Sequence, residues 1–287
     1  MPISLPYIDG SRIYLKFEYL QKAAHPLIPV GTHLGFDQFD LSTEDMNLSL
    51  PESHSAVTAE QTKTGWLVCG EAFTYHFNVK LGTFDSCVIN GIECFVRPAE
   101  FDIYRAPTEN DMGEAGIASY GQHSWNSLRL DAAPICNLQA VYHVHGNGAV
   151  EVSMHGSVRK YLDYHPRFGM RYFLTEDFQN FTYFGYGPQE NGSHYGTEEC
   201  TLSNANTILK AYSTNHFSFC ASEYTREELA AKKHQFELQK SGYTVWNIDY
   251  AMTGVGSGSC GPYTLEQYRL TEMEFVFDYT FFPQKKS

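Results

Sequence analysis

The sequence contains no long apolar run and carries little positive charge. No stretch approaches the roughly 20 apolar residues that a membrane span needs, and residues 1–10 lack the basic and apolar regions of a signal peptide. Lysine and arginine number 20 against 33 acidic residues, which gives a formal net charge of −13. A chain with this charge repels the phosphate backbone of nucleic acids. We therefore expect neither a membrane nor a nucleic acid as partner, whereas a neutral sugar would be indifferent to the charge.

The cysteines form neither a metal-binding motif nor a disulfide framework. They are seven in number, scattered along 287 residues at positions 69, 87, 94, 136, 200, 220 and 260, and no C-x-x-C spacing occurs. Disulfide frameworks are typical of short secreted domains, so this usage predicts free thiols and a cytoplasmic location. An excised fragment would also lack its signal sequence, so the location is an expectation from cysteine usage.

Apolar and aromatic residues are abundant instead, in patterns that predict strands. Hydrophobic residues make up 43%, aromatic residues 15% and charged residues 18%, which excludes a disordered chain and favours pleated, half-buried surfaces. Short alternating runs recur from residue 65 onward, and Asn90-Gly91 between two of them is a strong hairpin signal. The one convincing helix spans residues 225–238, with Thr225 as N-cap and Glu228 completing a capping box. The sequence predicts a large, mostly antiparallel all-β sandwich with one short helix.

The chain divides into three predicted segments. Residues 1–44 contain two alternating strands, at 12–19 and 33–41, and two strands alone cannot bury a face in water. Residues 45–64 are polar and are interpreted as a linker. Residues 65–287 form the sandwich itself, and the whole chain is near the upper limit of about 250–300 residues for one hydrophobic core. The first segment therefore needs a neighbour.

The side chains that could carry chemistry form no specific motif. His143 and His145 share one strand face, but the expected register sets His155 opposite Gln139, so a third zinc ligand is missing and surface histidines are favoured. Residues 254–258 resemble a phosphate loop without its Lys-Ser/Thr ending, and no G-x-S-x-G elbow occurs. A retaining glycosidase needs two carboxylates about 5–5.5 Å apart. The sequence pairs none of its loop acids, which are Glu109, Asp111, Glu114, Glu190, Glu198 and Glu199.

Seven strings carry more information than these single residues. They are YRAPTENDMG (104–113), HSWNSLRLD (123–131), PRFGM (166–170), YFGYGP (183–188), QENG (189–192), FSFCASEYTREEL (217–229) and WNIDYAMTGVGSGSCGP (246–262). In this order and spacing they resemble the fifth, C-terminal domain of bacterial β-galactosidases of glycoside hydrolase family two, which in some bacteria is a separate small subunit. The string KAAHPLIPVGTHLGFDQF (22–39) resembles the last strands of the preceding immunoglobulin-like domain. The resemblance covers residues 12–283.

The resemblance implies a galactose mutarotase-like supersandwich and a part in the retaining hydrolysis of β-D-galactosides such as lactose. In that family the catalytic glutamates belong to a central α/β barrel, and this chain has no βα repeat to build one. The magnesium and sodium ligands of the family also belong to absent segments. We therefore assign no catalytic residue, metal or cofactor to this chain. We expect a non-catalytic C-terminal region or small subunit that works with a catalytic barrel or large subunit in a homo- or hetero-oligomer.

The resemblance places one sugar contact in this region. The best-known member has a tryptophan platform on the loop after the last glycine-rich turn, and the matching position is Cys260, flanked by Ser259 and Gly261. A thiol has less area than an indole and no ring face on which a sugar can stack. We therefore expect weak sugar binding through Cys260, while residues 257–262 still form a wall of the site.

Five polar residues of the same strings are predicted to be structural, held by Arg–carboxylate and Asx-type hydrogen bonds. They are Arg105, Asn110, Asp111, Glu190 and Asn191. Family members usually carry a few tens of residues between GYGP and QENG, whereas the two strings run together here over residues 185–192. Either this loop is shortened, or residues are missing from the sequence.

Two other functions stay open. A mutarotase-like enzyme would need a general acid and a general base in one cleft, and His165, His194 and His216 are available. A stand-alone carbohydrate-binding module would expose aromatic platforms. Its candidates are Trp66, Trp125 and Trp246, of which the last two are expected to be buried core residues.

Overall fold

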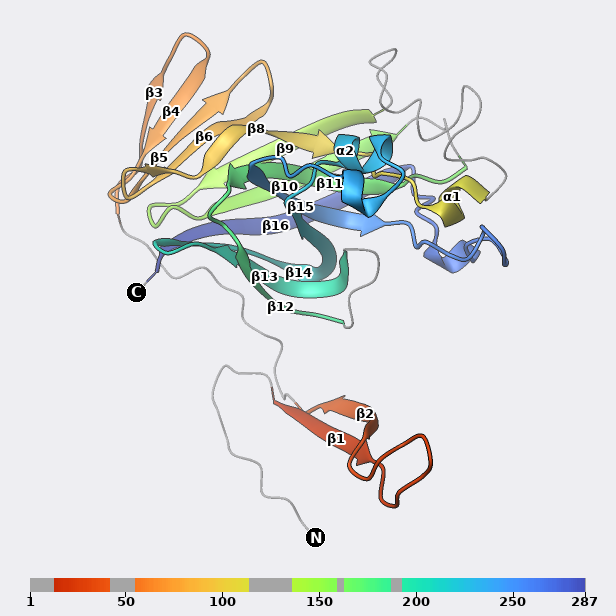
Figure 1. The fold of residues 1–287 in the computed structure, drawn as a ribbon. Coiled ribbons are helices and arrows are strands. Elements are labelled where there is room, and N and C mark those ends of the chain that lie inside the picture. Colours follow the sequence, from red (N-terminus) through yellow and green to blue (C-terminus); the bar gives the residue numbers. More distant parts are fainter. Residues whose placement is uncertain (1–12, 42–54, 114–135, 159–162, 187–192, 287) are drawn as a thin grey trace. The chain divides into compact units, whose positions relative to one another are not determined.

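The computed structural model describes residues 13–41, 55–113, 136–158, 163–186 and 193–286. The chain divides into two compact units, Met1–Ser49 and Leu50–Ser287, both drawn in Figure 1. Strands dominate the second unit, as the sequence predicts, and every paired strand runs antiparallel to its neighbour. Within the described residues, no helix has the length and apolar character to cross a bilayer.

The first unit contains one hairpin, built from the two strands that the sequence predicts. The strands are β1 (Tyr14–Leu20) and β2 (His33–Asp40). Phe17 and Phe39 lie on one face of this hairpin with their rings in edge contact at 5.9 Å, yet they stay 46% and 52% exposed. The hairpin therefore leaves an apolar face uncovered within its own unit, because two strands cannot cover it themselves.

The second unit begins with a five-stranded sheet in sequential order. Its strands are β3 (Thr58–Gln61), β4 (Gly65–Cys69), β5 (Phe73–Asn78), β6 (Thr83–Ile89) and β7 (Ile92–Glu93). Asn90 and Gly91 adopt φ angles of 50° and 80°, the left-handed pair that a tight hairpin turn requires, which confirms the predicted turn. Strand β3 lies inside the segment 45–64 that was interpreted as a linker, and it pairs with β4.

A nine-stranded sheet makes up most of the second unit, in the order β8-β11-β15-β14-β16-β10-β9 with β13 and β12 continuing from β14. Figure 1 shows β13 and β14 curving strongly. The strands are β8 (Phe95–Asp102), β9 (Cys136–Val144), β10 (Val150–Val158), β11 (Arg167–Thr175), β12 (Asn180–Phe184), β13 (His194–Ser203), β14 (Thr207–Ser222), β15 (Tyr243–Met252) and β16 (Glu274–Lys285). The sequence did not predict β13, because its buried positions are largely polar and give no apolar alternation: His194, Thr197, Cys200 and Leu202.

One hydrophobic core joins the two sheets. It contains Phe73 and Tyr75 from the five-stranded sheet together with Val152 and Phe281 from the nine-stranded sheet. Alternation in β10 produces it, since residues 150, 152 and 154 are buried while residues 151 and 155 are exposed. Trp246 is completely buried in this core, as predicted, and Trp125 lies outside the described residues.

The helices differ from the prediction. Thr225 is the N-cap of α2 (Arg226–Ala231) and accepts from the Glu228 backbone N–H at 3.1 Å, but the helix ends long before residue 238. The Glu228 carboxylate accepts from the Gln239 backbone N–H instead of closing a capping box. No residue of α2 is buried, so no packed face extends it, and a separate 3₁₀ turn follows at Gln235–Glu237. A second helix, α1 (Glu109–Gly113), is too short to show helical periodicity and was not predicted.

Candidate functional site

Two of the family strings meet at one edge of the nine-stranded sheet, namely the edge formed by the C-terminal ends of β8 and β15. Strands β8 and β15 both pair antiparallel with β11, so they run in the same direction and end at the same edge. The segment that follows β8 carries α1, and the segment that follows β15 carries the loop Ser257–Pro262. Strand topology therefore brings Arg105, Asn110 and Asp111, three of the predicted structural residues, together with the predicted sugar contact at Cys260.

Asn110 of α1 connects these two segments directly. Its side-chain Nδ2 donates to the Gly256 carbonyl at 2.8 Å. Its Oδ1 accepts from the Ser259 backbone N–H at 3.2 Å and from the Ser259 hydroxyl at 2.6 Å. One amide side chain thus satisfies three polar groups of the glycine-rich loop and fixes the residue that precedes Cys260.

Arg105 and Asp111 hold α1 in turn. The guanidinium donates two parallel hydrogen bonds to the Asp111 carboxylate, at 2.6 and 2.8 Å, and both side chains are buried. The same carboxylate accepts from the Thr108 backbone N–H at 2.7 Å and from its hydroxyl at 2.8 Å. Such a bidentate pair fixes direction as well as distance, so the position of Asn110 follows from a buried charge pair.

The loop that carries Cys260 is a closed turn. The backbone N–H groups of Cys260 and Gly261 both donate to the Ser257 carbonyl, at 3.2 and 2.6 Å. Gly256 adopts φ +61°, and a Cβ there would lie 2.5 Å from the Thr264 hydroxyl, so only glycine fits. Cys260 at the tip is exposed, and its sulfur lies 3.9 Å from the Ser259 hydroxyl. The glycines of residues 254–258 therefore shape a turn against the following segment.

Behind this loop, buried charges connect β8, β11 and β15. Arg167 donates to Asp249 at 2.6 Å, and Asn247 donates to Asp102 at 2.8 Å. Arg226, at the start of α2, also donates to Asp102. Burial raises the pKa of Asp249 to about 6, although Arg167 acts in the opposite direction. Asp249 is completely buried, so it offers no atom that a substrate could reach.

Arg171 extends the charged network toward the surface. It donates to Glu100 at 2.8 Å and to Glu227 at 3.2 Å. Partial burial acts to raise the pKa of Glu227, but hydrogen bonds from Arg171 and Arg226 outweigh it and lower the pKa to about 2. The carboxylates of this network are thus engaged by arginines, an arrangement typical of structural ion pairs. A general acid and base would need pKa values near the working pH and access to a ligand.

The remaining acidic residues of the prediction are engaged on β13, exposed on α1 or outside the described residues. Glu198 pairs with His216 at 3.4 Å, and Glu199 pairs with Lys210 at 2.5 Å. Glu109 is exposed on α1. Glu114, Glu190 and Asn191 fall outside the described residues.

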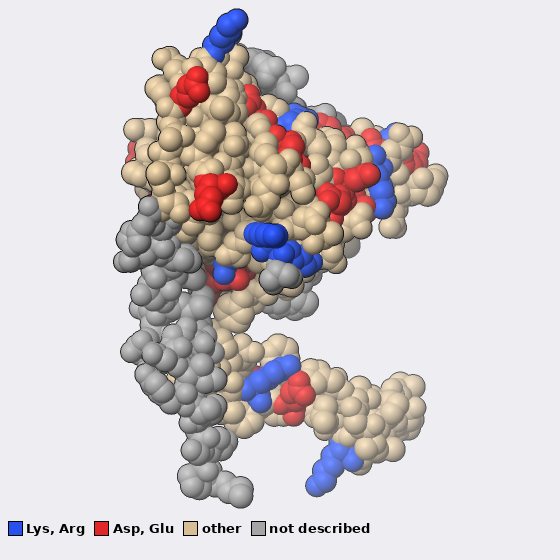
Figure 2. All heavy atoms as spheres, turned by 90° about the vertical axis from the view of Figure 1, so that its left-hand side faces the viewer, with Lys and Arg blue, Asp and Glu red and all other residues tan. Residues whose placement is uncertain are grey.

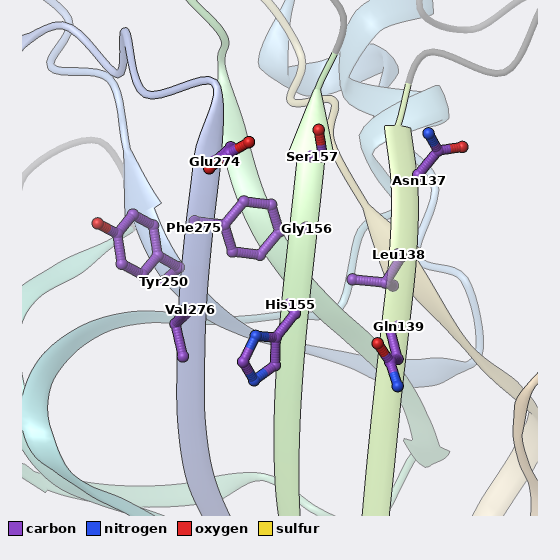
Figure 3. A pocket seen from close by; sticks show the side chains of 10 residues that line it. All are labelled: Asn137, Leu138, Gln139, His155, Gly156, Ser157, Tyr250, Glu274, Phe275 and Val276. Atoms are coloured by element: carbon purple, nitrogen blue, oxygen red, sulfur yellow. The ribbon is translucent and has the colours of Figure 1, made fainter.

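The histidine pair on β9 has no third ligand in the described part of the chain. His145 lies 3.0 Å from Glu151, and His143 is the register partner of the same glutamate. His155 pairs with Gln139, as predicted, and the two side chains lie on adjacent strands in Figure 3. Across the described residues, no group of three His, Cys, Asp or Glu could hold a metal ion.

The three histidines considered for a mutarotase lie in different surroundings. His165 is completely buried beside Phe168, and burial lowers its pKa to about 4. His194 is buried in an aromatic cluster and stacks on Phe219 at 4.5 Å. His216 is half exposed and faces Glu198. They come from different elements and do not form a common acid–base arrangement.

The described residues of the second unit line at least two hollows that are large enough for a small molecule. The first, of about 690 Å³, lies over β9, β10 and β16, where Figure 3 shows the Phe275 ring lying beside Gly156. The second has a volume of about 800 Å³. It is lined by Ser257 and Pro262, the first and last residues of the loop, and by three tyrosines, Tyr195, Tyr263 and Tyr268. The sequence did not predict these tyrosines, because only tryptophans were considered as sugar platforms. The chain has 20 tyrosines, and no local pattern distinguishes these three from the others. Trp66, by contrast, lies on β4, and Trp246 lies in the core.

Uncharged residues form most of the face of the second unit that Figure 2 shows, with acidic and basic side chains scattered among them. None of the seven cysteines, all of which lie in described segments, forms a disulfide. The predicted free thiols are therefore confirmed. Burial raises the pKa values of Cys87, Cys200 and Cys220, so these thiols stay protonated.

Comparison with known proteins gives consistent matches. The family described as β-galactosidase small chain matches residues 69–191 and 187–282. The chain is 32% identical to a β-galactosidase of Actinobacillus pleuropneumoniae over 98% of this chain and 34% of that protein. It is 27% identical to a β-galactosidase of Staphylococcus xylosus over 97% of this chain and 33% of that protein. The chain thus spans about a third of the length of these relatives. The two matched segments meet at residues 187–191, where the GYGP and QENG strings run together.

Proposed function

Because the matched segments cover most of its length, the chain belongs to the β-galactosidase small-chain family, and we infer that it forms the non-catalytic region of a β-galactosidase. In this proposal it completes the active-site wall of an enzyme that hydrolyses lactose-like β-D-galactosides. The glutamates that cleave the bond come from a larger catalytic partner. The two polypeptides, or two parts of one polypeptide, assemble as an oligomer in the cytoplasm, where free thiols are stable.

The observation that carries the proposal is the amide bridge from Asn110 to the loop before Cys260. Three hydrogen bonds to Gly256 and Ser259 connect α1 to this exposed turn, in addition to the hydrogen bonds within the turn itself. A surface turn needs no such fixation for folding alone, whereas a wall that orients a substrate must be held in place before the substrate binds. We therefore assign Ser259, Cys260 and Gly261 to substrate contact and Asn110 to positioning.

The buried pair of Arg105 and Asp111 supports the same positioning role. Arg105 and Asp111 are buried and joined by two hydrogen bonds, and Arg105 also approaches the Thr253 carbonyl at 3.5 Å. Thr253 begins the segment that leads into the glycine-rich loop. The pair thus contacts both segments of the site at their origin, which supports a positioning role and leaves no charge free for catalysis.

Magnesium and sodium are implied for the full enzyme by the family resemblance. The described residues contain no group of His, Cys, Asp or Glu that fits a metal ion. Three buried carboxylates of this region, Asp111, Asp249 and Asp102, are engaged by Arg105, Arg167 and Arg226. We therefore assign the ligands of both ions to the catalytic partner.

The test measures hydrolysis of a chromogenic β-galactoside by this chain alone and by this chain mixed with the rest of the enzyme as a separate polypeptide. We expect no turnover by the chain alone and turnover in the mixture. Asn110→Ala lowers the rate of the mixture about fivefold, the equivalent of about 1 kcal/mol from lost hydrogen bonds. Asn180→Ala, at an exposed position on β12, is the matched control and leaves the rate unchanged. Turnover by the chain alone at the rate of an intact enzyme overturns the proposal.

A further inference from the structure

We propose that a small cavity beside α2, with a volume of about 110 Å³, binds a tetrahedral oxyanion such as sulfate or phosphate. No carboxylate occurs among the described residues that line this arginine cavity, whereas four arginines do. They are Arg105, Arg167, Arg171 and Arg226. The inference goes beyond the proposed function, because the ion is neither a substrate nor a product of glycoside hydrolysis and its binding needs no catalytic partner.

The positive charge of the arginine cavity contrasts with the charge of the chain. The chain has 20 lysines and arginines against 33 acidic residues, yet four of the basic side chains line one small cavity. Salt screens exposed charges that lie farther away than about 8–10 Å. An anion that enters the cavity therefore responds chiefly to the groups around it. Guanidinium groups suit an oxyanion, because their planar arrangement of donors matches two oxygens at once.

Neighbouring carboxylates hold these arginines in place before an anion binds. Asp249 accepts from Arg167 at 2.6 Å, and Glu227 accepts from Arg171 at 3.2 Å. A guanidinium has five N–H donors, so such a pair uses only some of them. The carboxylates also weaken the positive potential, so we expect millimolar affinity for the oxyanion.

Arg167 has a donor that no described residue uses. Its side chain is 6% exposed, and its Nε has no hydrogen-bond partner in the part of the chain that the structure describes. A buried donor that stays unpaired costs free energy, because it has lost its hydrogen bonds with water. Since Arg167 lines the cavity, an oxyanion bound there offers an acceptor to this donor.

Neutral polar side chains supply further donors. Thr108, Ser193 and Asn247 line the cavity together with the arginines. Ser193 is 4% exposed, and its hydroxyl donates to the Met252 sulfur at 3.6 Å. A thioether sulfur is a weak acceptor, so the hydroxyl can turn toward an oxyanion at little cost.

The size of the arginine cavity selects a small ion. A single water needs at least about 10–15 Å³. The volume of about 110 Å³ therefore holds several waters or one sulfate or phosphate ion. It is smaller than the roughly 300–1,000 Å³ of sites for larger ligands. We therefore expect the cavity to bind an oxyanion group and no more of a molecule than that.

The experiment titrates the 287-residue chain with sodium sulfate by calorimetry, with sodium chloride at the same ionic strength as the reference. We expect saturable millimolar binding of sulfate and an increase of Tm that saturates over the same concentrations, because the ion binds only the folded chain. Sodium phosphate and phenyl phosphate are titrated in the same way. Equal binding of both identifies a terminal phosphate group as a possible ligand, whereas binding of phosphate alone identifies the free ion, and either result supports the site.

A cavity-filling variant separates anion binding from the ion pairs. Ala106 lines the arginine cavity, so Ala106→Leu places apolar volume in it and leaves all four arginines unchanged. We expect the affinity for sulfate to fall by about tenfold or more, because an apolar side chain takes the place of the ion. Ala59→Leu, at an exposed position of β3, is the matched control and binds sulfate like the wild type.

A charge variant predicts a change of opposite sign. Glu227 is 47% exposed at its side chain, pairs with Arg171 and Arg226, and does not line the cavity. Glu227→Gln keeps the shape and removes one negative charge, so sulfate binds about threefold more tightly. Arg167→Lys keeps the charge but loses the Nε donor, so sulfate binds about fivefold more weakly.

Each variant is first compared with the wild type by circular dichroism and thermal unfolding. If Ala106→Leu does not fold, Glu227→Gln and Arg167→Lys decide the question. The proposal is overturned if the wild type binds sulfate no more tightly than chloride, if folded Ala106→Leu keeps the wild-type affinity, or if Glu227→Gln does not bind more tightly. Every measurement uses this chain alone, so a failure of the proposed function leaves the result unchanged.

Discussion

The core of the nine-stranded sheet is held differently from the loop edge, by which we mean α1 and the Ser257–Pro262 loop that it contacts. In the core, β10 and β16 contribute alternating apolar side chains such as Val152, Met154 and Phe277, all buried and all fixed by packing. At the loop edge, Arg105, Asp111 and Asn110 fix the backbone by directional hydrogen bonds, and the loop that they hold stays exposed. The core therefore determines whether the chain folds, whereas the loop edge determines where one exposed turn lies.

The largest expected effect comes from the core. Trp246→Ala removes a completely buried side chain that packs near Tyr172 and Phe281. Such a truncation leaves a cavity and lowers the free energy of unfolding by about 3–5 kcal/mol. Chemical denaturation monitored by circular dichroism measures this change. Val276→Ala, at a half-exposed position of β16, is the control and shifts stability by less than about 1 kcal/mol. An equal loss in both variants would mean that packing in the core is not the dominant contribution.

The next largest effect comes from the buried ion pair at the loop edge. Arg105→Ala leaves the buried Asp111 carboxylate without its bidentate partner, and breaking a buried ion pair in this way costs about 3 kcal/mol. Arg105→Lys retains the charge but not the second parallel hydrogen bond, so it recovers only part of the loss. Denaturation curves of the two variants test this order. If Arg105→Lys matches the wild type, the planar geometry of the pair has no role.

The sequence predicted the core better than the loop edge, for a physical reason. Alternation is a local property, so the strands β4 and β6 and the Asn90-Gly91 turn followed from neighbouring residues, whereas the burial of Trp246 was expected from its place in a family string. The bridge from Asn110 to Ser259 joins residues separated by 149 positions, and no local pattern contains it. The family strings named both residues but assigned them different roles. Strand β13 and the 3₁₀ turn after α2 were missed because polar burial and missing packing leave no periodic signal.

A smaller effect separates fixation of the loop from stability of the fold. Asn110→Ala removes the hydrogen bonds to Gly256 and Ser259, while the Arg105–Asp111 pair remains. We expect the global stability to fall by no more than about 1 kcal/mol. Hydrogen exchange at the Ser259 amide becomes about fivefold faster, since local opening costs less free energy. If exchange at Ser259 stays slow in this variant, the loop is held by its own turn and not by Asn110.

The smallest effect at neutral pH concerns the buried residue His165. Its ring is completely buried beside Phe168, and in the described part of the chain neither ring nitrogen has a hydrogen-bond partner. Burial lowers its pKa from 6.5 to about 4. The unfolded chain therefore binds a proton more tightly than the folded chain, so the titration of this group leaves stability unchanged above pH 6.5 and lowers it as the pH falls toward 4.

Asp249 acts in the opposite direction over nearly the same range. Burial raises its pKa from 3.8 to about 6, so the folded chain binds this proton more tightly and gains stability as the pH falls through 6. The two groups partly cancel in the wild type. His165→Phe keeps an aromatic ring beside Phe168 and removes two buried polar atoms, so we expect about 1 kcal/mol more stability at pH 7. Below pH 6 the variant gains stability relative to the wild type, because only the Asp249 contribution remains. Unfolding free energies measured from pH 7 to pH 4 test this divergence, and parallel curves would show that folding does not lower the pKa of His165.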